Sequence, residues 1–336
     1  MIKRILIVGL GSIGKRHLGI ARDLFPGADI RILRHRETDK VPIQANGCFH
    51  KIEEATKFLP QIAILANPAT FHLTVADALA DVGVNVLVEK PIAASTEGVQ
   101  ELIEKYKRNG LILMIGYNLR FLTSLICFRN FLKKGMIGNI LSVRCEVGQD
   151  LPSWRPNTVY QEGVTAKREL GGGVLLELSH ELDYLRWIFG EVGWVKASVS
   201  TQSNLIIDVE DTAHLILGFK PTTKEDLLIA TLNMDFIRQD HTRICVAIGE
   251  KSSLRWNGIT GEVELYSALT KDWELLFKGK DQNNDSYLAE WSSFISCIKD
   301  NKEPPISGKD GIKVLEIIEA ARHSSLSGKQ VDLHWF

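Results

Sequence analysis

Short apolar runs alternate with helical patterns over the first 120 residues of the chain. The apolar runs are continuous, as expected for strands buried on both faces of a parallel sheet. They cover residues 3–8, 29–33, 62–66, 84–88 and 111–115. Between them, residues 70–82 and 95–109 place apolar side chains at the spacing of an amphipathic helix. This repeated order of strand and helix predicts a parallel, doubly wound α/β sheet.

The pattern changes after residue 120. A helical stretch at 122–134 precedes a run at 140–147 in which Leu141, Val143, Cys145 and Val147 share one face. Further strand-like runs lie at 195–201, 212–219, 227–234, 242–249, 253–256 and 262–266, and helices are expected at 286–299 and 309–327. We therefore expect two domains: residues 1–120, and an α+β domain of residues 121–336 with an open, mostly antiparallel sheet.

The composition of the chain limits the kinds of molecule that it is expected to bind. The 336 residues carry a net charge of -1 and no block of like charges, which argues against binding to nucleic acid or to an anionic membrane. Five scattered cysteines without a C-x-x-C spacing indicate neither a metal site nor a disulfide framework. The apolar run that follows Lys3 and Arg4 is too short for a secretory signal, so we read it as a strand and expect a cytoplasmic protein.

A glycine motif follows the first predicted strand. Gly9, Gly11 and Gly14 satisfy G-x-G-x-x-G where the strand ends and a helix begins, with Ser12 and Ile13 between the last two. In this context the glycines permit a tight turn, close approach of a pyrophosphate, and close packing of helix against strand. The motif predicts a dinucleotide site at the start of the helix, where free N–H groups face the phosphates.

The end of the second predicted strand bears on the choice between NAD and NADP. A carboxylate is expected there to bind the ribose 2′-hydroxyl of NAD, but the chain has Arg34, His35 and Arg36. Cationic side chains suit a 2′-phosphate, so we favour NADP over NAD. The alternative is a solvated charged loop in which Glu37 supplies the acid.

Polar clusters follow the carboxyl ends of the later strands, where open α/β sheets bind ligands. They contain Asn67, Pro68 and His72, then Glu89 and Lys90, then Asn118 and Arg120. An ammonium group beside a nicotinamide can polarise a carbonyl or lower the pKa of a hydroxyl, which makes Lys90 the most informative of them. The alternative is a turn at Asn67 and a solvated pair of Glu89 and Lys90.

A second candidate site lies beyond three successive glycines, residues 171–173. The residues after them are expected to form one amphipathic helix, with Glu177, His180, Tyr184 and Trp187 on a stripe opposite the core face. Histidine is suited to take and return a proton near neutral pH, and a carboxylate such as Asp183 can orient it. A lone histidine near a helix start is more often structural.

Taken together, these motifs resemble the glucose-fructose oxidoreductase and inositol dehydrogenase family (Gfo/Idh/MocA). The resemblance extends over nearly the whole chain, including the Glu-Lys-Pro motif at residues 89–91. It implies a Rossmann domain, and a substrate-binding and oligomerisation domain whose last helices pack toward the first. It also implies that Lys90 lies at the nicotinamide, that Glu89 helps to hold the cofactor, and that His180 is the acid/base with support from Asp183. Pairing through the open sheet would give a homodimer or homotetramer.

Two details qualify the resemblance. The family usually has an aspartate four residues before the histidine, whereas Glu177 stands three residues before His180. We expect the longer glutamate side chain to compensate, which leaves Glu177 as a catalytic candidate. Residues 150–156 and 167–170 are similar to members linked to surface-polysaccharide or nonulosonic-sugar synthesis. This likeness suggests Trp154 as a stacking platform and Arg155 and Lys167 as anion contacts, unless these side chains only fill space or face solvent.

The expected function is transfer of a hydride between a nicotinamide cofactor and a secondary alcohol or ketone of a sugar, cyclitol or nucleotide sugar. Lys90 and His180 would assist the proton transfer. One alternative is an NAD-recycling hydrolase or epimerase of the same family. Another is a non-catalytic dinucleotide-binding sensor, because fold alone does not determine function.

Overall fold

The structure, a computed structural model, describes residues 2–35, 41–154, 159–221, 227–280 and 284–334. The chain divides into two compact units. The first contains Met1–Tyr117 and Leu288–Leu315, and the second contains Asn118–Tyr287 and Glu316–Phe336. The change of pattern near residue 120 thus falls close to the first division, while residues 288–315 return to the first unit.

The first unit contains a six-stranded sheet of order β3-β2-β1-β4-β5-β6, with every pair of strands parallel. Its strands are β1 (Arg4–Val8), β2 (Asp29–Leu33), β3 (Gly47–Phe49), β4 (Ile62–Leu65), β5 (Asn85–Glu89) and β6 (Leu113–Gly116). The predicted parallel α/β sheet is confirmed. Our prediction missed β3, because an edge strand of three half-buried residues has no apolar run to reveal it.

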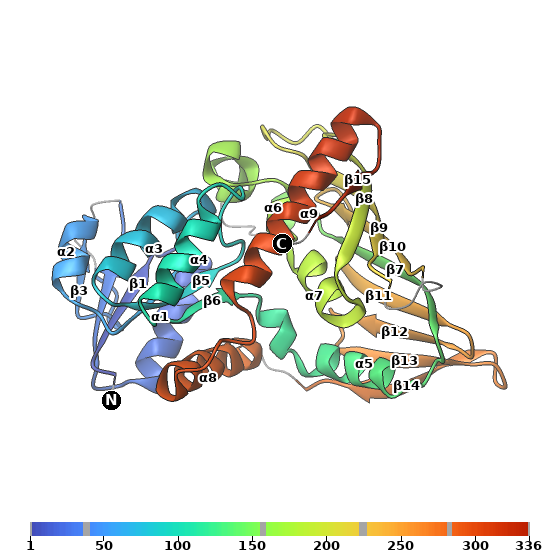
Figure 1. The fold of residues 1–336 in the computed structure, drawn as a ribbon, viewed down its shortest axis with the longest axis horizontal. Helices are drawn as coiled ribbons and strands as arrows, with labels where there is room; N and C mark the ends of the chain where they lie inside the picture. The colour runs from blue at the N-terminus through green and yellow to red at the C-terminus, as the bar shows by residue number, and fades with distance from the viewer. Residues whose placement is uncertain (1, 36–40, 155–158, 222–226, 281–283, 335–336) are drawn as a thin grey trace. The chain divides into compact units, whose positions relative to one another are not determined.

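Helices cover both faces of this sheet, as the parallel connections require (Figure 1). They are α1 (Ser12–Leu24), α2 (Ile52–Lys57), α3 (His72–Asp81), α4 (Val99–Arg108) and α8 (Asp285–Asp300). On one face α3 and α4 lie side by side, and the Tyr106 hydroxyl of α4 donates to the Ala76 carbonyl of α3 at 2.8 Å. On the other face α8 packs on α1, with the rings of Phe25 and Trp291 6.4 Å apart.

The C-terminal segment is attached to the edge strand of this sheet. The Ile115 N–H of β6 donates to the Ile306 carbonyl at 3.0 Å, and Met114 forms an isolated bridge with Ser307. Helix α9 (Gly308–Ser327) begins directly after this contact. No periodicity in the sequence predicts this return, because the pairing joins residues almost 200 positions apart.

The second unit contains a nine-stranded sheet of order β14-β13-β12-β11-β7-β10-β9-β8-β15. Its strands are β7 (Ile140–Gly148), β8 (Val192–Ser200), β9 (Thr212–Phe219), β10 (Ile229–Asp235), β11 (Thr242–Gly249), β12 (Ser253–Asn257), β13 (Glu262–Ser267), β14 (Asp272–Lys278) and β15 (Val331–Asp332). Among the described strand pairs of this second sheet, only β7 with β10 is parallel. The predicted open, mostly antiparallel sheet is confirmed, although the outer strands β14 and β15 were missed.

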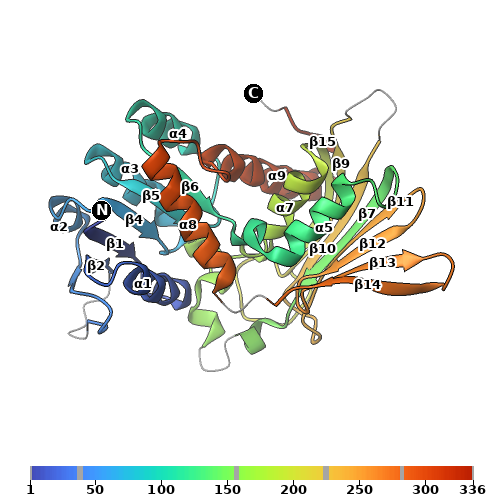
Figure 2. The same ribbon diagram turned by 90° about the horizontal axis from the view of Figure 1, so that it is seen from below.

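Helices α5 (Thr123–Lys133), α6 (Val174–Glu177) and α7 (His180–Phe189) lie on one face of this sheet (Figure 2). The core between them is aromatic: Trp256 and Tyr184 are fully buried and meet edge to face, with ring centroids 5.4 Å apart. The Trp256 indole N–H donates to the Ser124 hydroxyl at 3.0 Å. Tyr184, expected on one stripe with His180, is thus part of this core.

The expectation of one helix after the three glycines is wrong, because the chain forms two helices with a break between them. Helix α6 ends at Glu177 and α7 begins at His180, with Leu178 and Ser179 between them. The break resets the three-four spacing, so residues on the two sides of it no longer share a stripe. No helix among the described residues is both long and apolar enough to cross a membrane.

Buried and exposed side chains alternate along β9, which allows a direct test of which face of the sheet is buried. Leu215 is 2% exposed and Ile216 is 40% exposed, on opposite faces of the same strand. Leu215→Ala should lower the free energy of unfolding by about 2 to 5 kcal/mol, because it opens a cavity in the core. Ile216→Ala should cost about 1 kcal/mol or less. Urea denaturation followed by circular dichroism measures both, and equal losses would contradict the assignment of faces.

Candidate functional site

The glycine turn after β1 forms a backbone cradle at the start of α1. Gly9 has φ +85°, and a Cβ on it would stand 2.6 Å from the Ala66 carbonyl oxygen. A Cβ on Gly14 would overlap the Gly9 carbonyl, whereas Gly11 has open space on its Cβ side. Gly11 caps α1 without a side-chain hydrogen bond. The free N–H groups of the first turn therefore suit a dinucleotide pyrophosphate, as the motif predicts.

The two basic residues described after β2 lie at the strand's end. The Arg34 N–H donates to the Phe49 carbonyl at 3.1 Å, and the His50 ring lies 3.1 Å from the Arg34 carbonyl. Arg34 is half-buried and His35 is exposed. Arg36 lies outside the described residues. The backbone of Arg34 is thus held at the carboxyl end of β2.

His72 joins two of the predicted clusters. Its ring is 1% exposed, with Nε2 2.8 Å from the Asn67 carbonyl and Nδ1 3.0 Å from the Pro91 carbonyl. Burial lowers the pKa of His72, while the two backbone carbonyls act in the opposite direction. Both ring nitrogens face the chain's own backbone. His72 therefore connects the Asn67-Pro68 turn to the turn that follows Lys90, rather than offering a free nitrogen to a ligand.

Glu89 ends β5 directly before Lys90, and its carboxylate turns inward. His17 Nε2 lies 2.7 Å from Glu89 Oε1, and Glu89 is 8% exposed. Lys90 is half-buried at the carboxyl end of the sheet. His17 was not predicted, although its position three residues after Gly14, on the apolar face of α1, was a signal that it points into the unit.

In the second unit, the three glycines allow close packing of the chain. Gly173 has φ +105°, and a Cβ on it would stand 2.6 Å from the Glu210 carboxylate. A Cβ on Gly172 would overlap the Val164 carbonyl. The Val174 N–H donates to the Glu210 carbonyl at 3.1 Å, and Arg322 donates to the Glu210 side chain at 3.2 Å. These contacts hold the start of α6 and so the segment that leads to His180.

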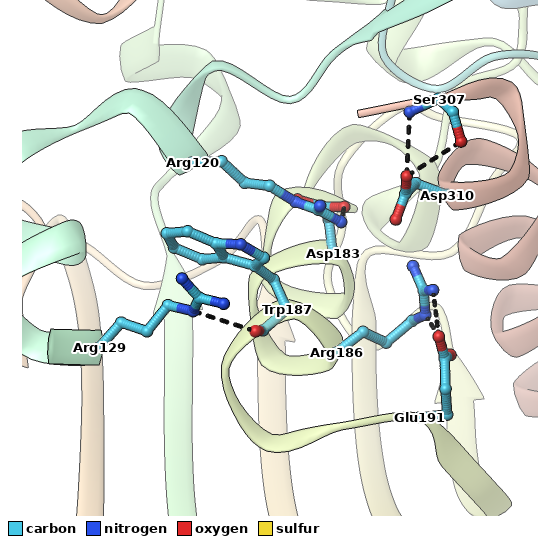
Figure 3. A network of polar contacts seen from close by, with 8 residues as sticks. All are labelled: Arg120, Arg129, Asp183, Arg186, Trp187, Glu191, Ser307 and Asp310. Atoms are coloured by element: carbon cyan, nitrogen blue, oxygen red, sulfur yellow. Dashed lines mark hydrogen bonds and ion pairs between the residues drawn. The ribbon is translucent and has the colours of Figure 1, made fainter. Parts of the chain in front are cut away.

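His180 is the first residue of α7, and Glu177 is the last residue of α6. Both side chains are half-buried. Asp183, one turn further along, is 1% exposed and belongs to a buried ion pair (Figure 3). Arg120 Nε and Nη2 donate to its two oxygens at 2.8 and 2.6 Å. Asp183, predicted to support His180, and Arg120, predicted to contact substrate, are therefore partners of one another.

A second arginine stacks beside this pair. The Arg129 guanidinium lies 4.1 Å from the ring centre of Trp187, and its Nε donates to the Trp187 carbonyl at 3.3 Å (Figure 3). The Arg120 guanidinium lies 5.9 Å from the same ring. Burial lowers the pKa of Arg129, and the charge of Arg120 adds to this effect. The indole face thus offsets part of the repulsion between two cations.

The remaining predicted substrate contacts are spread over the second unit. Trp154 packs its ring against the edge of Phe236 at 5.3 Å, and its indole N–H has no hydrogen-bond partner among the described residues. Asn118 donates to the Ser286 hydroxyl at 2.9 Å, and Lys167 is half-buried. Arg155 lies outside the described residues. Trp154 is the one of these with a buried polar group available to a ligand.

Sequence reasoning also missed a buried ion pair at the start of α7, directly after His180. Glu181 follows His180, is fully buried, and accepts a hydrogen bond from Arg243 Nε at 2.7 Å. Arg243 comes from β11, 62 residues away. The sequence contains little indication of this pair, because nothing in the spacing of the carboxylates on this short helix distinguishes Glu181 from its neighbours.

Two family models match the chain and together cover most of it. Residues 3–117 match "Oxidoreductase family, NAD-binding Rossmann fold", and residues 129–333 match "Oxidoreductase family, C-terminal alpha/beta domain", both of the Gfo/Idh/MocA type. Among curated relatives, the myo-inositol 2-dehydrogenase of Thermotoga maritima is 26% identical over 346 residues. That alignment covers 98% of this chain and 98% of the relative.

Solved structures share the fold over the whole length. Levoglucosan dehydrogenase in complex with NADH has a TM-score of 0.86 at 18% identity, covering 99% of this chain and 100% of that one. The WlbA dehydrogenase from Bordetella pertussis, in complex with NADH and UDP-GlcNAcA, has a TM-score of 0.81 at 21% identity, covering all of both chains. At these identities the likeness concerns the fold alone.

The ion pair of Arg120 and Asp183 can be compared with a pair whose two side chains are both exposed. Asp183→Asn should destabilise the protein by about 3 to 5 kcal/mol, because it leaves a buried guanidinium without its anion. On α4, Arg108 pairs with Glu104, and the two side chains are 70% and 54% exposed. Glu104→Gln should therefore cost only about 0 to 1 kcal/mol. Chemical denaturation of both variants measures the difference, and equal effects would show that burial does not set the cost.

Proposed function

Because the chain belongs to the Gfo/Idh/MocA oxidoreductase family, we propose that it is an NAD(P)-dependent dehydrogenase of a sugar-like substrate. The reaction interconverts a secondary alcohol and a ketone on a sugar, cyclitol or nucleotide sugar. The observation that carries the proposal is the glycine cradle at the start of α1, in the same unit as Lys90 at the carboxyl end of β5. Open α/β sheets bind their ligands at this edge.

The residues of the first unit fit a dinucleotide. Gly11 leaves room for a pyrophosphate at the N–H groups of Ser12 and Ile13, and Gly9 and Gly14 let the backbone pack closely around this turn. The turns that begin at Asn67 and Lys90 border the same edge of the sheet. The nicotinamide, when bound, accepts a hydride from the alcohol or returns one to the ketone.

Lys90 and His180 have complementary roles in this proposal. The Lys90 ammonium donates to the substrate oxygen and stabilises the negative charge that develops on it. His180 removes the hydroxyl proton in the oxidative direction and returns it in reduction. Glu177, at the end of the preceding short helix, is proposed to assist His180. Asp183 orients the start of α7 through its ion pair with Arg120.

A polyhydroxylated substrate is supported by the relatives and by the second unit. The relatives described above are named for an inositol and for levoglucosan, and one was solved with UDP-GlcNAcA. Trp154 offers a flat ring and an indole N–H, and Lys167 and Arg155 offer cations for an anionic group. We therefore propose a nucleotide sugar or an acidic sugar, and a homodimer or homotetramer formed through the open sheet.

Two substitutions test the catalytic assignment. Lys90→Met and His180→Ala should each lower kcat by at least about 100-fold, because general acid–base assistance contributes roughly that much. Binding of the dinucleotide, measured by quenching of tryptophan fluorescence, should change by less than about threefold. Lys107→Met, an exposed lysine of α4, and His323→Ala, an exposed histidine of α9, are the matched controls.

Turnover is followed by the absorbance of the reduced nicotinamide with a panel of sugars, inositols and nucleotide sugars. Near-normal rates in both variants would remove the two roles. Conversion of substrate without net change in reduced cofactor would instead identify a recycling hydrolase or epimerase.

Cofactor choice is tested by titration with NADPH and with NADH. We expect tighter binding of NADPH, because a guanidinium at the end of β2 can pair with a 2′-phosphate. Arg34→Ala should weaken NADPH by about tenfold, the loss of one hydrogen bond to a charged group, and leave NADH unchanged. Equal affinities in the wild-type protein, unchanged by the substitution, would reject the preference.

A further inference from the structure

A cluster of buried polar side chains lies behind Lys90 in the first unit. His17 comes from α1, Glu89 from the end of β5, and Glu290 and Trp291 from α8. His17, Glu290 and Trp291 are fully buried, and Glu89 is 8% exposed. One potential ligand atom from each of His17, Glu89 and Glu290 lies within 4.8 Å of the others. Three titratable groups are thus enclosed next to the proposed catalytic lysine.

The protonation of His17 follows from Trp291. The Trp291 indole N–H donates to His17 Nδ1 at 2.9 Å, and an indole nitrogen can only donate. His17 Nδ1 is therefore unprotonated, and Nε2 carries the hydrogen. Nε2 donates it to Glu89 Oε1 at 2.7 Å, and the Lys90 backbone N–H lies 3.3 Å from Glu89 Oε2. Glu89 thus receives one hydrogen-bond donor on each of its two oxygens.

Glu290 is in the opposite situation. No hydrogen-bond donor among the described residues reaches either of its carboxyl oxygens, and one of them lies within 4.8 Å of an oxygen of Glu89. An ionised carboxylate without donors, fully buried and close to a second carboxylate, is among the most unfavourable arrangements in a protein. Burial raises the pKa of Glu290 well above its ordinary value, and the charge of Glu89 raises it further. Both effects favour the neutral form of the Glu290 carboxyl group.

A histidine and two glutamates could also bind a divalent cation, but the hydrogen bonds of this cluster argue against a metal site. A metal requires a lone pair on the histidine nitrogen that faces it. The nitrogen of His17 that faces Glu89 carries a hydrogen, because Trp291 occupies the lone pair of the other. The cluster accommodates a proton more readily than a metal.

We propose that Glu290 is a positioning residue that shares its proton with Glu89 and so holds the carboxyl end of β5, which presents Lys90. The shared proton keeps the charge of the two carboxyl groups at minus one. Ionisation of Glu290 would place two negative charges side by side and displace the strand end. The role of Lys90 rests on the function proposed above, whereas the shared proton does not.

The sign of the pH dependence follows from the neutral state. A carboxyl group whose pKa is raised in the folded protein stabilises the fold below its unfolded pKa. That contribution is lost as the pH rises through the folded value. The other titratable groups near the pair are His17 from α1 and His72 from α3, which interacts with the charge of Glu89. Both histidines are fully or almost fully buried and contact fixed partners.

Three full-length proteins test the proposal without substrate or cofactor: wild type, Glu290→Gln and Glu290→Leu. Glutamine can donate to Glu89 but cannot ionise, and leucine can do neither. Wild type should show the infrared carbonyl band of a protonated carboxylic acid at neutral pH, and Glu290→Gln should lack it. The melting temperature of wild type should fall more steeply at alkaline pH than that of Glu290→Gln. Glu290→Leu should melt below both at neutral pH.

Kinetics then connect the proton to Lys90. At neutral pH Glu290→Gln should keep kcat/KM within about threefold of wild type. Glu290→Leu should lose about tenfold or more, chiefly in kcat, because one hydrogen bond to a charged group is missing. Glu290→Gln should also lack the alkaline decline of kcat that Glu290 causes in wild type.

Several results would overturn the proposal. An infrared band that persists in Glu290→Gln, or the same alkaline loss of stability in both proteins, would overturn the shared proton. Stoichiometric zinc or manganese in the purified protein, with a lower melting temperature after chelation, would replace the proton by a metal. Normal turnover in Lys90→Met would instead reject the proposed function, and the infrared and melting measurements would still decide the state of Glu290.

Discussion

The carboxyl group of Glu89 is the constraint on which the first unit depends. Because it stands at the end of a buried strand and is only 8% exposed, it must find hydrogen-bond donors inside the protein. His17 supplies one, and Trp291 determines which nitrogen of His17 can do so. This requirement joins α1, β5 and α8 in one network. A segment from the C-terminal part of the chain is therefore part of the dinucleotide-binding unit.

The second unit meets a similar requirement with ion pairs. Arg120 and Asp183 satisfy one another with two hydrogen bonds, and Arg243 satisfies Glu181. Both acids lie on α7, so these two arginines fix the helix that begins with His180. A buried pair of this kind contributes orientation more than net stability, since the cost of removing both charges from water offsets much of their attraction. The helix is thereby held from two sides.

The two family models match nearly the whole chain, whereas only a few side chains distinguish one substrate from another. Proteins similar to this chain are named for an inositol and for levoglucosan, and one was solved with a nucleotide sugar. The fold supplies the cofactor edge and a scaffold, and we propose that local residues such as Trp154 and Lys167 determine which substrate is bound. Our proposal of a nucleotide sugar or an acidic sugar rests on those residues.

Local pattern alone determined the parallel sheet, the glycine cradle and the antiparallel second sheet, because apolar periodicity and glycine spacing report the backbone directly. It also singled out Lys90 and His180 as candidates. Only the tertiary structure paired Arg120 with Asp183, turned His72 toward two carbonyls, and joined His17 to Glu89. Glu290 gained a role in the same way. Packing brings together residues up to 274 positions apart in these networks, and no local spacing encodes which buried donor meets which acceptor.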